Sequence, residues 1–375
     1  MSRPICIQIN WQRQFGGGEV YTRFFTQALL AQGWDVQIVV DRKAAFWHHL
    51  GLDGVRFLPI GHGSEIPDAL PATPAVVVTH TTLPADLARQ VAARHRLGGF
   101  VHMPLADRAP AGLAYYHRIF AVSAYVRDTA IARSHRQVYP QPLLAVADLA
   151  PRTRSGGAIV RRSEYDWDLR KVRDRVLSWT EPLRALRPRH AFVRRPGITL
   201  GIVSRLTPIK QFPLLFSHLA QVLADFPGIH LEIFGSGGYA SVCDLRRALG
   251  PILGRTRFWG HQPDPAAVYG QLDYVLSGLP EREALGLNLI EAQAAGTPVI
   301  AVDAPPFVET VVSGASGFLY VDPRRDGGAS FRELMTRLAG GTSRPNPRLA
   351  TEHLAKFSRA AFEQRVAAAM ATLAP

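Results

Sequence analysis

Short apolar runs alternate with segments of helical periodicity along almost the whole chain, and this alternation constrains the fold most. The run Ile5–Asn10 is followed by Gly16–Gly18 and by residues 20–32, where apolar side chains recur every three or four residues. Further runs of the first half lie at 35–40, 55–60, 75–80, 100–102, 118–123 and 137–139, with helical segments at 83–95 and 124–134. Strands separated by helices favour βαβ units and a mostly parallel sheet.

A second half repeats the pattern. Its apolar runs lie at 198–203, 229–234, 257–259, 274–276, 299–302 and 318–321, and helical segments lie at 212–226, 241–249, 266–271 and from 330 to the closing segment 358–373. A length of 375 residues suits two domains. We therefore expect an α/β protein of two doubly wound, Rossmann-like domains that face each other across a cleft.

Residues 151–197 interrupt the alternation and are strongly basic. Thirteen basic and five acidic residues give this segment a net charge of +8, out of +13 for the protein. Apolar residues recur there as in a helix with one apolar stripe and one basic face: Trp167, Leu169, Val172, Val176 and Trp179. Such a segment suits an anionic membrane surface, and the alternative is a solvated insertion near the domain junction.

Composition sets broader limits. A hydrophobic content of 47% against 19% charged residues excludes wholesale disorder. Four lysines stand against a large excess of arginine, which can follow genome base composition as well as function. Cys6 and Cys243 form no metal-binding or disulfide pattern. No apolar run approaches eighteen residues, so we expect a cytoplasmic protein, with a peripheral position on the inner face of the plasma membrane as the second option.

Glu283 and Glu291 flank a predicted loop-to-helix transition after the strand 274–276, with seven residues between them. In a doubly wound sheet, ligands dock where such loops leave the carboxyl ends of strands. The alternative is structural, because Asn288 and Glu291 fit the capping box of a helix start. The pair is a candidate ligand site or a helix cap.

Two further strand ends carry residues suited to phosphate. Gly16, Gly17 and Gly18 open the first predicted helix, where free amides and close backbone approach favour an anion; a plain glycine-rich turn is the alternative. Arg205 and Lys210 follow the first strand of the second half and could neutralise a diphosphate. Exposure to solvent is the ordinary fate of such cations.

Two other motifs are weaker evidence of a functional site. Residues 235–240 match the dinucleotide pattern GxGxxA, but the next strand ends in Gly260 and His261 without the acid that would hold a ribose, so a nicotinamide site is disfavoured. Asp166 and Asp168 lie in the basic segment away from any predicted strand end, and we attribute their spacing to chance.

His80 and His102 both end strands of the first half. A histidine at such a position could bind a sugar hydroxyl or assist proton transfer, and a structural role in the core is the alternative.

Several of these segments together resemble the retaining nucleotide-sugar glycosyltransferases of the GT-B type, in particular glycosyltransferase family 4. The resemblance covers nearly all of the second half and scattered parts of the first. It rests on these segments: GGGE, VHMPL, AVSAYVRD, GIVSRLTPIK, LEIFGSGG and EREALGLNLIEAQAAGTPVIAVDAPPFVETVVSGASGFL.

The resemblance implies a GT-B fold with an N-terminal acceptor-side domain at 1–195, a C-terminal donor-binding domain at 198–355, and a C-terminal helix, 356–375, that crosses back to the first domain. It implies metal-independent transfer of a sugar from a nucleotide diphosphate, with retention, to a glycan or lipid-linked acceptor in polysaccharide biosynthesis. The implied catalytic residues are Glu283, His102, Arg205 and Lys210. The implied donor-binding residues are Gly16, Gly17, Gly18, Arg205, Lys210, Gly235, Glu283, Leu285, Gly286, Leu287 and Glu291.

In these roles Glu291 would hold the donor ribose, Glu283 the transferred sugar, and the two cations the diphosphate. No cofactor, no metal and no nucleic acid is expected. The chain departs from the family pattern at Gln211, where glycine is usual, at residues 140–146, where an Asn-Gly-Val turn is usual, and in the long segment 151–197. A GT-B epimerase or phosphorylase, a nucleic-acid-binding protein and a non-catalytic sugar-binding protein remain alternatives.

Overall fold

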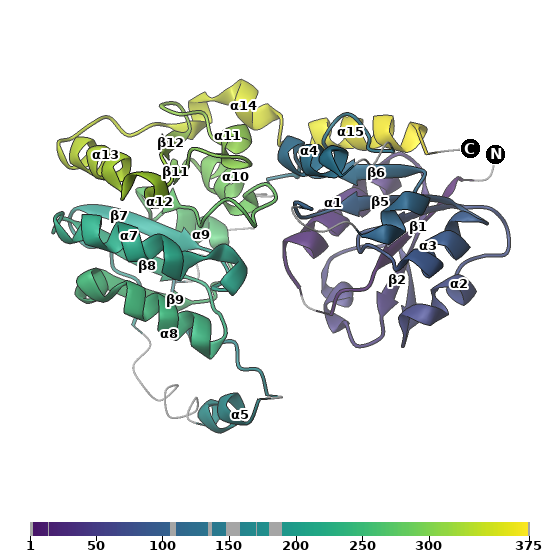
Figure 1. Ribbon diagram of the computed structural model, residues 1–375, viewed down its shortest axis with the longest axis horizontal. Coiled ribbons are helices and arrows are strands. Elements are labelled where there is room, and N and C mark those ends of the chain that lie inside the picture. The colour runs from purple at the N-terminus through teal and green to yellow at the C-terminus, as the bar shows by residue number, and fades with distance from the viewer. Residues whose placement is uncertain are drawn as a thin grey trace. The chain divides into compact units, whose positions relative to one another are not determined.

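The computed structural model describes residues 3–13, 15–105, 110–133, 137–147, 158–169, 171–179 and 190–373. The chain forms two compact units, one made of Met1–Ala147 with Ala355–Pro375 and the other of Asp148–Leu354. Each unit is built on a six-stranded sheet whose strands all pair in parallel (Figure 1).

The first unit has the strand order β3-β2-β1-β4-β5-β6. Its strands are β1 (Ile5–Asn10), β2 (Asp35–Asp41), β3 (Arg56–Ile60), β4 (Val76–Thr79), β5 (Arg96–Val101) and β6 (Arg118–Ala121). The central strands are buried on both faces, as expected of a parallel sheet that helices cover. The chain winds in opposite directions from β1 and β4, so the switch point of the topology lies between these two strands.

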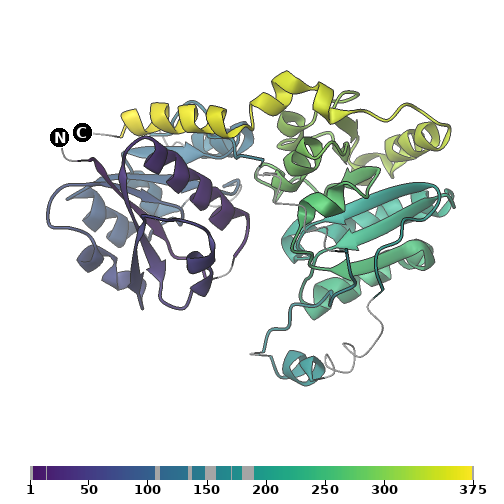
Figure 2. The same cartoon turned by 180° about the vertical axis from the view of Figure 1, so that it is seen from behind.

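Helices of the first unit come from both ends of the chain. They are α1 (Gly17–Ala31), α2 (Ile66–Ala69), α3 (Ala85–Ala92), α4 (Ala124–Ala132) and α15 (Arg359–Ala371). α15 packs beside α1, where Tyr21 and Phe362 bring their ring centroids to 5.5 Å and Gln32 Nε2 donates to the Glu363 carbonyl at 2.9 Å (Figures 1 and 2). The resemblance expects a C-terminal helix on the first domain, and α15 lies there.

The second unit repeats the same topology with the order β12-β11-β10-β7-β8-β9. Its strands are β7 (Ile198–Val203), β8 (Ile229–Phe234), β9 (Thr256–Gly260), β10 (Tyr274–Leu276), β11 (Val299–Val302) and β12 (Gly317–Tyr320). Here the switch point lies between β7 and β10.

Helices of the second unit pack on one another around this sheet. They are α5 (Val172–Ser178), α7 (Phe212–Ala224), α8 (Tyr239–Ala248), α9 (Pro265–Tyr269), α10 (Leu287–Ala294), α11 (Phe307–Thr310), α12 (Pro323–Asp326), α13 (Ala329–Ala339) and α14 (Thr351–Ala355). α7 contacts α8, α12 and α13, and α10 contacts α9 and β11. In Figure 1, α7 and α8 lie in front of the strands. Among the described residues no helix has the length and apolar character needed to cross a bilayer.

The domain boundary differs from the one expected at residues 195–198. The described part of the basic segment belongs to the second unit, because its backbone joins the ends of that sheet. The amide of Arg162 donates to the Trp259 carbonyl at 2.9 Å, and that of Asp166 donates to the Gly237 carbonyl at 2.8 Å. These main-chain pairs are long-range in sequence, so composition alone could not place the boundary.

Two local predictions also differ. Residues 137–139 form no strand of their own, and Val138 makes only an isolated parallel bridge to Ile119. The predicted helix of the basic segment is shortened to α5, because Trp167 stacks on Tyr165 and lies near Tyr239 instead of continuing the helix. The periodicity was correct only from Val172 onward.

Candidate active site

Two loops meet at the switch point of the second unit. One follows β7 and carries Arg205 and Lys210, and the other follows β10 and carries Glu283. Their backbones touch, because a Cβ placed on Gly278 would lie 2.5 Å from the carbonyl oxygen of Lys210. This contact brings together residues that lie about seventy positions apart in the sequence.

Lys210 and Glu283 form an ion pair between Nζ and Oε2. The side chains are 23% and 14% exposed, so the pair is sheltered but still open to a ligand. A cation and a carboxylate that were both predicted from sequence thus contact each other directly. An ammonium beside a carboxylate can neutralise a departing phosphate while the carboxylate faces positive charge elsewhere on the substrate.

Arg205 precedes Lys210 on the same loop, and its side chain is exposed. Within the described part of the chain, its guanidinium makes no ion pair or hydrogen bond. A planar guanidinium with unused donors is suited to bidentate binding of phosphate oxygens.

The helix that carries Glu291 begins earlier than the capping-box interpretation requires. α10 begins at Leu287, and its N-cap is Gly286, which adopts the left-handed conformation at φ 79°. Asn288 therefore lies inside the first turn, and its Nδ2 donates to the Val203 carbonyl at 3.2 Å. The capping-box alternative is wrong, because Gly286 and not Asn288 is the N-cap of α10. Asn288 instead connects α10 to the end of β7 through its hydrogen bond to Val203.

Glu291 is held from the side by a buried tyrosine. The Tyr269 hydroxyl donates to Glu291 Oε2 at 3.1 Å, and burial, followed by the nearby Glu291 charge, raises the pKa of Tyr269 well above its usual value. The tyrosine therefore stays protonated and orients the carboxylate. In the loop before α10, the side chain of Leu285 is buried, while Leu287 is partly exposed.

Close packing requires glycine at position 235, which the sequence alone did not show. Its φ is 151°, and a Cβ there would lie 1.8 Å from the Ser204 carbonyl oxygen. A Cβ at Gly237 would likewise lie 2.1 Å from the Leu206 carbonyl oxygen. Both glycines let the loop after β8 approach the loop that carries Arg205.

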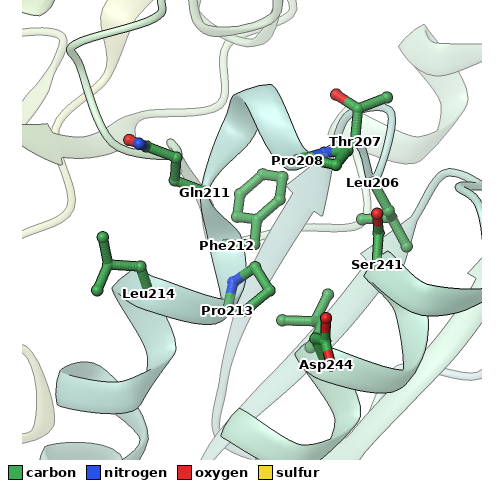
Figure 3. A pocket seen from close by; sticks show the side chains of 10 residues that line it. Leu206, Thr207, Pro208, Gln211, Phe212, Pro213, Leu214, Ser241 and Asp244 are labelled. Carbon is green, nitrogen blue, oxygen red and sulfur yellow. The ribbon is translucent and has the colours of Figure 1, made fainter.

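A cavity of about 240 Å³ lies behind that loop, between the start of α7 and α8 (Figure 3). Its lining is mostly apolar and consists of Leu206, Thr207, Pro208, Gln211, Phe212, Pro213, Leu214, Ser241, Asp244 and Leu245. The predicted residues Arg205, Lys210, Glu283 and Glu291 do not line it. Gln211, where the family has glycine, adopts the left-handed conformation at φ 53°.

In the first unit, the glycine run forms the start of α1. Gly16 is the N-cap, and the helix begins at Gly17. A Cβ on Gly17 or Gly18 would meet nothing within 4 Å, so the first turn is open to a ligand. Open amides at a helix N-terminus favour an anion.

His80 and His102 contact each other at the carboxyl ends of β4 and β5. His80 Nδ1 lies 3.2 Å from His102 Nε2, and His80 Nε2 lies 2.9 Å from Gln8 Oε1. Burial lowers the pKa of His102 to about 4 and lowers that of His80 well below its usual value. Both rings are therefore neutral near pH 7.

Sequence reasoning missed Gln8, although a signal was present. Gln8 and Asn10 occupy alternate positions of a strand that is otherwise apolar, and both are buried. Polar residues at period-two spacing in a buried strand indicate a hydrogen-bonded row on one face.

Within the described ranges, no group of three or more His, Cys, Asp or Glu side chains is arranged to hold a metal ion. In the basic segment, Asp168 Oδ2 lies 3.9 Å from Lys171 Nζ, and the Asp168 amide donates to Asp174 Oδ2 at 3.2 Å.

The two units together have the fold of solved GT-B proteins. Over 98% of this chain and 99% of the other, the structure matches Anabaena HepE in complex with UDP-glucose, with a TM-score of 0.68 and 16% identity. A glycosyltransferase from Rickettsia africae matches over 100% of this chain and 99% of its own, with a TM-score of 0.69 and 14% identity. At these identities the likeness establishes the fold alone.

Sequence similarity to two curated proteins covers little more than a third of this chain. The chain is 34% identical over 159 residues to a D-inositol 3-phosphate glycosyltransferase of Rhodococcus erythropolis, which covers 38% of this chain and 36% of the relative. It is 31% identical over 139 residues to a phosphatidyl-myo-inositol mannosyltransferase of Mycolicibacterium smegmatis, which covers 36% of this chain and 35% of the relative. The matched segments thus span about a third of each relative. Residues 190–333, which carry Arg205, Lys210, Glu283 and Glu291, match the family described as glycosyl transferases group 1.

Proposed function

We propose that the protein is a retaining, metal-independent glycosyltransferase of the hexosyltransferase type that uses a nucleotide-diphosphate sugar. The observation that carries this proposal is the Lys210–Glu283 pair at the switch point of the second unit, with Arg205 on the same loop. A doubly wound sheet binds its ligand at this point. The match of residues 190–333 to glycosyl transferases group 1 supports the same conclusion.

In this proposal, Arg205 and Lys210 bind the diphosphate and stabilise its charge as it departs. Glu291 accepts hydrogen bonds from the ribose hydroxyls, in the orientation that Tyr269 imposes, while Gly235, Leu285, Gly286 and Leu287 shape the backbone around the donor. Glu283 contacts the transferred sugar. In the first unit, His102 is proposed to bind a sugar hydroxyl and the amides of Gly16–Gly18 to bind an anion.

The proposed reaction breaks the bond between the anomeric carbon and the diphosphate oxygen. A bond from the acceptor oxygen forms on the same face of the sugar, and the acceptor proton passes to the departing diphosphate. Lys210 and Arg205 lower the barrier because negative charge grows on the diphosphate in the transition state. Activity that persists in EDTA is the expected result if these cations replace a metal ion.

A thermal-shift screen of UDP, GDP and ADP tests the donor site, with Glu291→Ala as the test variant and Glu352→Ala, an exposed acid on α14, as the matched control. We expect one nucleotide to stabilise the wild type and the control but not Glu291→Ala. No shift with any nucleotide, or an equal shift in Glu291→Ala, would contradict the proposal. A separate screen for the acceptor should include inositol phosphate and phosphatidylinositol beside lipid-linked glycans, because these groups appear in the names of two relatives.

The described basic segment supports the further proposal of an anionic membrane surface. On and beside α5, the side chains of Val172, Val176 and Trp179 are 66%, 50% and 72% exposed at helical spacing. The opposite side is anchored, because Asp174 is buried and Arg173 stacks 4.7 Å over the Tyr239 ring. An exposed apolar stripe with basic neighbours fits anionic lipid, and each cation near the surface adds about 1 kcal/mol.

Sedimentation with vesicles of phosphatidylcholine alone, or with added phosphatidylglycerol, tests this surface. We expect binding only to the anionic vesicles, and loss of binding in a Val176→Asp, Trp179→Ala variant. Val193→Ala is the control, because Val193 is similarly exposed outside the stripe. Equal sedimentation with both vesicle types would exclude the membrane role and leave the solvated-insertion alternative.

A further inference from the structure

A row of buried polar side chains runs through the apolar interior of the first unit. Its members lie on β1, on α1 and after β4: Gln8, Asn10, Thr22, Thr26 and His80. The apolar layer around them includes Phe25 and Phe100, both buried. The proposed chemistry uses only His102, at the far end of this row, and leaves the other members without a role.

The donor and acceptor of each hydrogen bond in the row can be assigned in turn, beginning at Thr26 on α1. The Thr26 hydroxyl donates its proton to the Thr22 carbonyl at 2.8 Å, so its oxygen can only accept from Gln8 Nε2, also at 2.8 Å. This contact fixes which end of the Gln8 amide carries the nitrogen. The Gln8 carbonyl oxygen must then face His80 Nε2, at 2.9 Å.

A carbonyl oxygen accepts and never donates, so His80 Nε2 carries a proton. The buried His80 is neutral, which leaves Nδ1 with a lone pair and no proton. His102 Nε2, 3.2 Å away, must therefore donate to it. His102 is neutral as well, so its other nitrogen, Nδ1, is bare.

Aromatic packing holds both rings in the planes that these hydrogen bonds need. His80 stacks on Phe100, with centroids 5.0 Å apart and planes 9° apart, and meets Phe25 edge-on at 5.5 Å. His102 meets the Tyr21 ring edge-on at 5.1 Å, and the Tyr21 hydroxyl is anchored on the Leu143 carbonyl at 2.7 Å. This packing sets the ring planes, and the hydrogen bonds of His80 to Gln8 and to His102 set which nitrogen faces each partner.

We propose that Gln8 and His80 are positioning residues that hold His102 with its proton on Nε2 and with an unprotonated Nδ1 that accepts no hydrogen bond from the described part of the chain. His102 is only partly buried, so its ring can meet a substrate. A bare nitrogen binds a group that donates a hydrogen bond, such as a sugar hydroxyl, and does not bind a fully ionised phosphate oxygen, which can only accept. The tautomer follows from the row alone, whereas the hydroxyl as ligand rests on the proposed function.

Nitrogen-15 NMR of histidine-labelled protein tests the tautomer without any substrate. At pH 7 we expect both rings to show a protonated Nε2 and an unprotonated Nδ1. Gln8→Glu keeps the shape but places a carboxylate beside His80 Nε2, which favours a doubly protonated His80. His80 Nδ1 would then donate to His102 Nε2, and the His102 proton would move to Nδ1.

Thr26→Val is the second variant, since it keeps the shape and removes the hydroxyl that orients the Gln8 amide. We expect it to give a mixture of both His102 tautomers. His95→Gln is the matched control, because His95 is a buried histidine of the same unit outside the row. An inverted tautomer in the wild type, or an unchanged one in whichever of the two variants folds, would overturn the proposal.

Kinetics separate this proposal from the proposed function. If a transfer reaction is found, Gln8→Glu should lower kcat about 10-fold to 100-fold with little change in the KM of the nucleotide donor, by analogy with the loss of the partner that orients a metal-bound histidine. A purely structural role would lower thermal stability without moving the tautomer. The predicted tautomers together with no transfer from any nucleotide sugar would refute the function and leave the positioning role standing.

Discussion

The two units share one topology but hold their polar groups in opposite ways. At the switch point of the first unit, His80 and His102 are neutral and joined by directional hydrogen bonds. At the switch point of the second, Lys210 and Glu283 are a charged pair that remains partly exposed. The partners explain the difference. Desolvation favours the neutral form of an imidazole that has only uncharged neighbours, whereas Lys210 and Glu283 are each other's counter-ion.

One buried carboxylate in the second unit is surrounded by hydrogen-bond donors. Glu232 lies on the interior strand β8 and is fully buried, and several donors converge on it. Arg195 and Arg257 each donate to Oε1 at 2.9 Å, and the Trp259 indole donates to Oε2 at 2.7 Å. This cluster also fastens the end of the basic segment to the sheet.

Glu232→Ala should give the largest effect. It leaves two guanidinium groups without their shared carboxylate, and we expect the free energy of unfolding of the second unit to fall by about 3–5 kcal/mol. Urea denaturation provides the measurement. Asp225→Ala is the control, because Asp225 and its partner Arg332 are exposed and their loss should cost under about 1 kcal/mol. Equal losses in both variants would contradict the role of burial.

Lys210→Ala should affect activity far more than stability. We expect kcat/KM to fall about 100-fold to 1000-fold, since the charge that stabilises the departing diphosphate is lost. The free energy of unfolding should change by about 1 kcal/mol or less, because the pair with Glu283 is not fully buried. Lys356→Ala, an exposed lysine in the first unit, should retain full activity. A loss of stability that accounts for the loss of rate would show that the pair is structural.

Acidification should weaken the first unit selectively. His102 has a pKa of about 4 in the folded protein and about 6.5 unfolded, so the unfolded chain binds more protons between these values. The stabilisation is complete above pH 6.5 and is lost as pH falls toward 4, by about 3 kcal/mol for His102. His80 contributes in the same direction, and Tyr21, the other titratable group in contact, stays neutral.

Hydrogen exchange of amides in β1 and β4 measures this local stability at each pH. His102→Gln should flatten the dependence between pH 6.5 and 4. Asp41, whose pKa is lowered by its hydrogen bonds to Arg13 and Lys43 despite its burial, acts mainly below this window. A wild-type profile that is flat from pH 7 to 4 would show that the histidines have the same pKa in the folded and the unfolded protein, and would contradict the lowered pKa.

Gln211→Gly should give the smallest effect, a gain. Gln211 has φ 53° at the N-cap of α7, the one left-handed non-glycine residue among those described, and its Oε1 is buried without a partner there. Glycine removes the strain between Cβ and backbone, and we expect about 1 kcal/mol of added stability. Gln211→Ala keeps Cβ and should add nothing. Equal melting temperatures for the glycine and alanine variants would contradict the prediction that the backbone at residue 211 is strained.

The strands of both sheets could be predicted because each is a short apolar run between turns or helices. Residues 137–139 were predicted on the same grounds, yet Val138 makes only an isolated bridge to Ile119, so local preference alone did not decide strand formation there. The start of α10 was misjudged for a related reason. Asn288 is a good cap by type, but Gly286 in the left-handed conformation begins the helix first.

For the candidate site, the sequence could select residues but not the contacts between them. Residue type and position at a strand end were enough to select Lys210, Glu283 and His102. That Lys210 would contact Glu283 depends on the close approach of Gly278 to the Lys210 backbone. That His102 would rest on His80 and Gln8 depends on the register of β1 against β4, which pairs Gln8 with Val78.

By itself, the sequence determined two α/β halves and the chemical groups that stand at their strand ends, because strand and helix periodicities and strand-end positions are local properties. Only the tertiary structure decided that residues 158–169 and 190–197 belong to the second unit, that Gly286 begins α10, and which tautomer the hydrogen bonds impose on His102. Burial and hydrogen-bond partners come from residues distant in the chain. Charge state and orientation follow from those partners, so they emerge only when the chain is folded.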